Sequence, residues 1–291
     1  MTGEPPADHP ADEPTRGIVL RVLGHFDLVV DGVSLELPVQ VQKVLAFLAL
    51  RDGSQPRERV AEQVWPCVDL RHCMGSLRTV LWRIRQVSPN TVRASRGSVA
   101  LGPSVRVDLQ EAWATSRQIL AGRPVDPPWA VQLLSRPLLP DWDEPWALLE
   151  QERIKQMSVH CLENLSRQLV AEAQYAYAMQ AAEAACGIEP LRESARRAVI
   201  DIHLAEGNRA QARWVYEDFR RLLQAEMGIE PSAQLMSSFT TRARPALPAA
   251  RDGEEILCLP PDRVQGLWGG FPSGSRTQTV WTGRRPQSSA V

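Results

Sequence analysis

The chain has 291 residues, with 33 Lys or Arg and 34 Asp or Glu, so its formal net charge is −1. This length suggests about two domains of roughly 100–200 residues each. A neutral total argues against a nucleic-acid partner only if the charge is spread evenly. Residues 17–108 hold twelve basic and eight acidic side chains, net +4, whereas residues 109–240 hold thirteen and eighteen, net −5. The sequence therefore predicts a basic module joined to an acidic one.

Several features exclude whole classes of protein. The longest apolar run, residues 44–50, is too short to span a bilayer. The acidic, Pro-rich start has no secretory signal pattern, and we expect residues 1–16 to be a disordered arm. Five scattered cysteines show no disulfide framework, which indicates free thiols in a reducing cytoplasm. Cys67, His72 and Cys73 lie close together but lack a fourth ligand, so we expect no metal and no cofactor.

The first elements are predicted to be strands followed by two helices. Residues 18–37 alternate and are rich in β-formers, and Asp31-Gly32 lies between two apolar runs. This pattern predicts two or three short antiparallel strands with a hairpin at the Asp-Gly pair. A stripe of apolar residues at helical spacing follows Pro38 and another follows Pro56, and proline is tolerated at the first helical position.

A third helix and a second hairpin complete the basic module. Asp69 is a candidate cap for a helix over residues 70–87. Two short strands are expected at residues 91–94 and 98–101, and residues 105–109 are a candidate for one more. Strands, three helices and a hairpin are the element order of a winged helix-turn-helix.

The acidic half is Ala-rich and predicted to be helical. Helices are expected at 145–172, 174–186, 191–206, 208–226 and about 231–240. The stretch GIEP occurs at residues 187–190 and again 41 residues later, at 228–231. We interpret each occurrence as a glycine that ends one helix and a proline that begins the next. Because the same helix-ending and helix-starting residues recur, the sequence predicts a repeat of helical hairpins that loosely resembles a tetratricopeptide repeat.

The helix at residues 70–87 carries the strongest functional signal. At about 100° per residue its side chains separate into an apolar face and a polar face. After Asp69 the polar face has four arginines and no carboxylate. Phosphates repel carboxylates, and guanidinium groups match phosphates and guanine edges. The helix is therefore predicted to contact double-stranded DNA, with an ordinary basic surface helix as the alternative.

The side chains in the early turns of this helix are expected to reach base edges, and its later arginines are expected to contact phosphates. The hairpin arginines are expected to contact an adjacent stretch of backbone or the minor groove. The predicted DNA-contacting residues are Arg71, His72, Ser76, Arg78, Thr79, Arg83, Arg85, Arg93 and Arg96. Trp82 lies on the same face, where packing on the hairpin is favoured over contact with a sugar.

Several segments resemble a known family. RVLGHFDLVVDG, PVQVQKVLAFLAL, VAEQVW and SLRTVLWRIR resemble the OmpR-type winged-helix module of the Streptomyces antibiotic regulatory proteins. LLPDWDEPWALLEQERIKQMSVHCLENL and the two GIEP stretches resemble that family's tetratricopeptide-like bacterial transcriptional activator domain. The resemblance covers about residues 18–240. It implies an activator of an antibiotic (secondary-metabolite) gene cluster that binds direct repeats near a promoter and recruits RNA polymerase.

We therefore expect a mainly α fold with small β elements, in which an N-terminal winged helix-turn-helix precedes an all-α tetratricopeptide-like domain. The expected parts are a disordered arm (1–16), a winged-helix DNA-binding domain (17–108), an activator domain (109–240) and a disordered tail (241–291). The activator domain is expected to serve self-association or docking to the winged-helix domain. Only 16 residues precede the winged helix, so we expect no receiver domain, and no phosphate-loop motif indicates an ATPase. The tail contains Trp268, Phe271 and Trp281. A tail without a selected function explains these residues more simply than a partner-binding motif.

Enzyme chemistry is not expected, because no GxSxG or HExxH motif occurs. Asp141, Asp143 and Glu144 form an acidic cluster that helix capping at Pro145 explains more simply than acid–base catalysis.

Two other functions stay open beside the activator. One is a protein-binding adaptor whose winged helix no longer binds DNA. The other is a ligand-gated regulator with a small molecule in a groove of the helical repeat, although core packing is favoured for its candidate lining. That lining is Tyr175, Tyr177, Trp214 and Tyr216.

Overall fold

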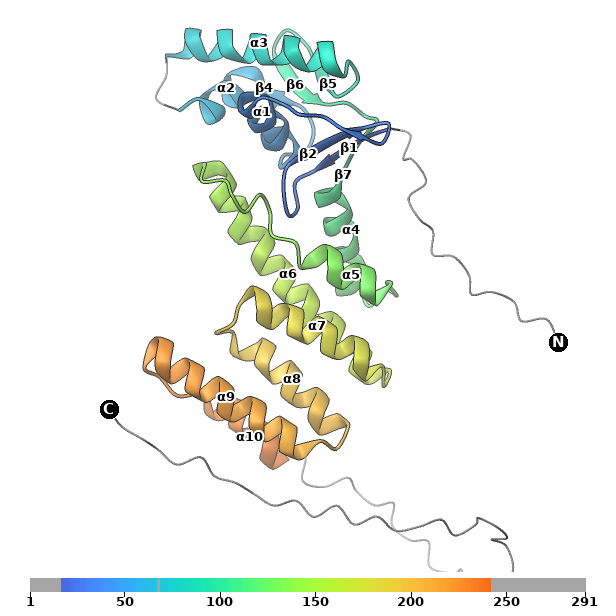
Figure 1. Ribbon diagram of the computed structural model, residues 1–291, viewed down its shortest axis with the longest axis vertical. Coiled ribbons are helices and arrows are strands. Elements are labelled where there is room, and N and C mark those ends of the chain that lie inside the picture. The colour runs from blue at the N-terminus through green and yellow to red at the C-terminus, as the bar shows by residue number, and fades with distance from the viewer. Residues whose placement is uncertain (1–16, 67–68, 242–291) are drawn as a thin grey trace, which may run out of the picture. The chain divides into compact units, whose positions relative to one another are not determined.

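The computed structural model describes residues 17–66 and 69–241 (Figure 1). The predicted arm at 1–16, Cys67, and the tail with Trp268, Phe271 and Trp281 lie outside the described residues. The described part is mainly helical with two small sheets, which confirms the expected fold class.

The first sheet contains the predicted hairpin. Its strands are β1 (Ile18–Arg21), β2 (Asp27–Val30), β3 (Val33–Ser34) and β7 (Val105–Val107), in the order β3-β2-β1-β7. Asp31 and Gly32 both have left-handed backbone angles, φ 49° and 85°, as the tight turn of a two-residue hairpin requires. The last strand pairs in parallel with β1, which brings the end of the basic module back to its beginning.

Three helices and a second hairpin follow, as predicted. The helices are α1 (Val39–Ala49), α2 (Arg57–Val64) and α3 (Leu70–Val87). Pro38 and Pro56 are the residues just before α1 and α2 rather than the first helical ones. The strands β4 (Gln55–Pro56), β6 (Ser98–Leu101) and β5 (Val92–Ala94) form an antiparallel sheet in that order.

The second half consists of helices joined by short turns. They are α4 (Asp108–Leu120), α5 (Pro127–Leu134), α6 (Pro145–Ala171), α7 (Tyr175–Ile188), α8 (Glu193–Ala205), α9 (Arg209–Met227) and α10 (Ala233–Thr241). From α6 to α9 each helix packs against the next, as the stacked ribbons of α7, α8 and α9 illustrate (Figure 1). Ala178, Ala181, Ala182 and Ala185 are fully buried along α7. Such small side chains let neighbouring helices approach closely.

The predicted helix ends and starts at the two GIEP stretches are wrong at three of the four glycine and proline positions. Gly228 does end α9 in a left-handed conformation, with φ 67°. Gly187, however, lies inside α7, because Ile188 packs partly buried against the core and the helix continues to it. Neither proline begins a helix: α8 starts at Glu193 and α10 at Ala233. Pro190 instead belongs to the turn after α7, where the Arg192 N–H donates to the Glu189 carbonyl.

A continuous core joins the winged-helix elements to the helical half. The buried carboxylate of Asp108, the first residue of α4, accepts backbone N–H bonds from Val22 at 2.9 Å and Leu23 at 3.0 Å. Burial raises the pKa of the Asp108 carboxyl, against the opposing effect of these N–H donors. Phe47 of α1 packs edge-on against Trp146 of α6, with ring centroids 5.4 Å apart.

Ion pairs span the same junction. Lys43 of α1 pairs with Glu144, and Arg51 binds Glu150 of α6 at 2.9 Å. The prediction that the acidic cluster caps α6 is therefore wrong for Glu144. It occupies the capping position, but its side chain makes no cap hydrogen bond and instead binds Lys43. Because Lys43 is distant from Glu144 in the sequence, no sequence pattern indicated this ion pair.

Candidate nucleic-acid interface

The helix α3 is oriented by its apolar face. Cys73, Leu77, Val80, Leu81 and Ile84 are buried at helical spacing, and the helix contacts both α1 and α2. The predicted cap is confirmed, because the Asp69 carboxylate accepts the backbone N–H of Arg71 at 3.2 Å. Burial of one face presents the opposite face outward along the whole helix.

The predicted DNA-contacting residues lie at the surface. The exposed ones are Arg71, His72, Arg78, Thr79, Arg83 and Arg85 on α3, with Arg93 and Arg96 on the hairpin. Ser76 is half-buried. The hairpin packs against the same helix through β5, so both sets of arginines belong to one module (Figure 1).

Most of these arginines have no protein partner. Within the described residues, the guanidinium groups of Arg71, Arg78 and Arg83 make no hydrogen bond or ion pair. Arg85 differs, because its Nη2 donates to the carbonyl of Ala94 on β5 at 3.4 Å. Arg85 therefore also ties the helix to the hairpin, a contact that helical spacing alone did not predict.

Other polar groups on the face are held locally. The Thr79 hydroxyl donates to the Gly75 carbonyl one turn earlier, at 3.2 Å, which leaves its oxygen free to accept. The His72 Nδ1 lies 3.9 Å from the Asp69 carboxylate, and the His72 side chain is 84% exposed. Both groups are therefore accessible to a partner.

Trp82 contradicts the sequence interpretation. It was expected to pack on the hairpin, but it is 61% exposed. The hairpin instead reaches α3 at Arg85, through Ala94. The exposed indole adds a flat apolar surface among the arginines.

The neighbouring helix provides a charge contrast. Glu58 and Glu62 of α2 are exposed, whereas no residue of α3 is acidic. Carboxylates beside a phosphate backbone are repelled. Of these two helices, α3 is therefore the one suited to lie against DNA.

The four aromatic residues considered for a small-molecule groove do not line one cavity together. Tyr216 is buried, while Tyr177 and Trp214 are 41% and 59% exposed. Of the four candidate residues, only Trp214 lines the cavity that involves α7, α8 and α9. The packing interpretation thus fits Tyr216 and the half-buried Tyr175, which packs against the core, and does not fit the exposed Tyr177 and Trp214.

Known proteins match this arrangement. The family model of the bacterial transcriptional activator domain matches residues 123–240. The regulatory protein AfsR of Streptomyces coelicolor is 26% identical over 254 residues, which are 82% of this chain and 26% of AfsR. Residues 123–240 therefore contain the bacterial transcriptional activator domain, and most of the chain is similar to a Streptomyces regulatory protein. Both findings support a transcriptional activator of the Streptomyces antibiotic regulatory type. The family resemblance noted in the sequence is thereby confirmed, and the matched family is one of regulators rather than enzymes.

A solved structure shares the fold of this chain. It is Mycobacterium tuberculosis EmbR in complex with a low affinity phosphopeptide, with a TM-score of 0.60 and 18% sequence identity. The match covers 76% of this chain and 64% of that chain. The chain spans about a quarter of AfsR and less than two thirds of EmbR. None of the described helices is long and apolar enough to cross a membrane.

Proposed function

We propose that the chain is a sequence-specific DNA-binding transcriptional activator of an antibiotic (secondary-metabolite) gene cluster, acting on the nucleoid in the cytoplasm. The observation that carries the proposal is the exposed face of α3, which has unpartnered arginines and no carboxylate. Unpaired guanidinium groups on one face suit a phosphate backbone because each contact releases counterions. An adaptor that binds only protein has no reason to exclude acids from this face.

The two halves have different proposed roles. Residues 17–108 read DNA: Arg71, His72, Ser76 and Thr79 reach base edges. The later arginines of α3 and those of the hairpin hold the backbone. Residues 109–240 serve self-association over direct repeats and recruitment of RNA polymerase. The net charge of −5 over this half supports the division, because like charges keep it off DNA.

Charge reversal tests the proposal directly. Arg78→Glu with Arg83→Glu is expected to weaken binding to duplex DNA by about 100-fold or more, because two attractions become repulsions. The matched control is Arg106→Glu with Arg123→Glu. These two arginines are also exposed and make no side-chain interaction within the described residues, and they lie outside α3 and the hairpin.

The readout is fluorescence anisotropy at fixed salt, with circular dichroism to verify folding. Equal losses in both double variants would mean that only net charge matters. No loss in the α3 variant would favour the adaptor.

Footprinting tests the proposed direct repeats. Two subunits side by side on one face of the duplex are expected to protect segments about 10–11 base pairs apart, or a multiple of this spacing. A single protected segment at saturating protein would contradict self-association on DNA.

A further inference from the structure

The helical half contains a cavity that the proposed DNA contacts do not use. It has a volume of about 730 Å³ and lies among α6, α7 and the connection from α5 to α6. Leu134, Leu138, Leu148, Ile154 and Ile188 form its apolar walls. Small-molecule sites typically have volumes of about 300–1,000 Å³ and mainly apolar walls with a few polar groups. The cavity therefore has the size and lining of a ligand site.

Two hydrogen-bond donors in the lining lack partners. Ser158 lines the cavity and is only 3% exposed, yet its hydroxyl makes no hydrogen bond within the described residues. The Ser158 hydroxyl is not one of the fully buried polar atoms that lack a partner, so it is accessible from the cavity. Arg136 also lines the cavity, and its guanidinium has no partner within the described residues. A hydroxyl and a guanidinium can both donate to an anionic oxygen.

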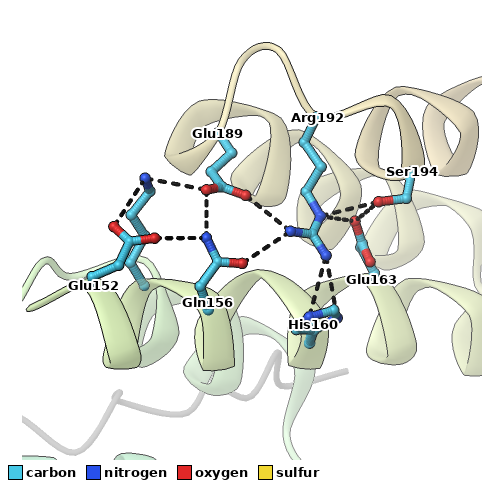
Figure 2. Close-up of polar contacts among 8 residues, drawn as sticks. Glu152, Gln156, His160, Glu163, Glu189, Arg192 and Ser194 are labelled. Atoms are coloured by element: carbon cyan, nitrogen blue, oxygen red, sulfur yellow. Dashed lines mark hydrogen bonds and ion pairs between the residues drawn. The ribbon is translucent and has the colours of Figure 1, made fainter. Parts of the chain in front are cut away.

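The other charges at the cavity compensate one another. Lys155 binds Glu189 at 3.1 Å and Glu152 at 3.5 Å. Both carboxylates belong to the polar network between α6 and the α7–α8 turn, where the Arg192 guanidinium joins Glu163, Glu189 and Gln156 (Figure 2). Arg136 is thus the uncompensated charge of the lining. The site is suited to an anion rather than a cation.

We propose that this cavity binds a small amphiphilic organic acid. Its apolar body would lie against the leucine and isoleucine walls, and its carboxylate would accept hydrogen bonds from Arg136 and Ser158. Guanidinium–carboxylate pairing gives both charge and geometric complementarity.

The cavity wall also contacts the winged helix. The carbonyl of Pro137 accepts the Gly24 N–H at 2.7 Å, and the Leu139 N–H donates to Val22 at 3.0 Å. Leu138, which lines the cavity, pairs with Leu23 across an isolated β-bridge. Occupation of the cavity is therefore transmitted to the DNA-reading module through residues 136–139. The ligand site itself does not depend on the proposed function, whereas an effect of the ligand on DNA binding rests on it.

Calorimetric titration of the full chain with decanoate tests the site. Saturable binding of one decanoate per chain is expected, with decylamine at least tenfold weaker. Arg136→Gln weakens decanoate binding about tenfold. Leu148→Glu does so as well, because it places a carboxylate in the wall at a side chain that is already 49% exposed. The control is Leu149→Glu, since Leu149 is 70% exposed and does not line the cavity.

Three results would overturn the site: no saturable binding up to about 1 mM decanoate, equal affinity for decylamine, or equal losses in the Leu148 and Leu149 variants. Hydrogen exchange measured without DNA tests the transmission. Saturating decanoate is expected to slow exchange of the Gly24 amide, because the segment that accepts its hydrogen bond becomes more rigid. Unchanged exchange at saturation would overturn the transmission, whatever the outcome for DNA binding.

Discussion

The arginines of α3 and Arg192 of the helical half have opposite surroundings. On α3 the guanidinium groups of Arg78 and Arg83 are exposed and have no partner within the described residues. In the helical half Arg192 binds Glu163 at 2.8 Å and Glu189 at 3.0 Å, with only 20% of its side chain exposed. The same residue type thus stabilises the fold at Arg192 and remains available to a partner at Arg78 and Arg83. Arginine content alone does not reveal this difference; the nearby carboxylates do.

The largest expected effect is on stability, at Arg192. Arg192→Met leaves Glu163, whose side chain is 9% exposed, without its cationic partner. Removing one partner of a mostly buried pair typically costs about 3 kcal/mol of unfolding free energy. Urea unfolding measures the loss. Arg213→Met is the control, because Arg213 is 77% exposed and such surface pairs contribute under about 1 kcal/mol. Equal effects would contradict the account of Arg192.

A second effect separates DNA binding from stability at Trp82. Because its indole is 61% exposed, Trp82→Ala is expected to change the unfolding free energy by less than about 0.5 kcal/mol. DNA affinity should fall about fivefold, since an exposed aromatic side chain can pack on a sugar. Anisotropy and urea unfolding of the same preparation distinguish the two quantities. A large loss of unfolding free energy with unchanged DNA affinity would mean that Trp82 packs in the fold and does not contact DNA.

A third effect concerns specificity at His72. His72→Ala is expected to change the preferred base at one position of the site, with a discrimination of about 1 kcal/mol, and to alter overall affinity less. Selection of binding sites from random duplexes measures the preference. Recovery of the same motif by both proteins would mean that His72 does not read a base.

The smallest effect is a pH dependence at Glu189. Burial opposes ionisation of this carboxyl, but hydrogen bonds from Arg192, Lys155 and Gln156 lower its pKa below the ordinary 4.5. The ionised form therefore stabilises the fold above about pH 4.5, and this contribution is lost as the pH falls through the lowered pKa. Urea unfolding over that range should show a smaller decrease for Glu189→Gln than for the unmodified chain. Parallel decreases would contradict the assignment.

Local chemistry made much of the fold predictable. Apolar spacing located α3, Asp69 marked its start, and the Asp-Gly pair located the first hairpin. Pairing between strands that are distant in the sequence was harder to predict. The strand β7 pairs with β1 across most of the module, and β4 has two residues, too few for an alternating pattern.

The same distinction applies to the candidate interface. Helical periodicity predicted which residues of α3 face outward, because period depends only on local backbone geometry. It did not predict that Arg85 binds the Ala94 carbonyl or that the hairpin leaves Trp82 exposed. Those contacts depend on where a separate element lies. The cavity beside Ser158 was missed for this reason too, since its lining comes from three separate segments.

The salt dependence of DNA affinity tests the central claim most directly. Each phosphate contact contributes about 0.9 to the slope of log affinity against log salt. Arg78→Ala with Arg83→Ala should therefore flatten the slope by about 2, whereas Arg106→Ala with Arg123→Ala should leave it unchanged. A slope in the α3 double variant equal to that of the unmodified chain would contradict the assignment of this face to DNA.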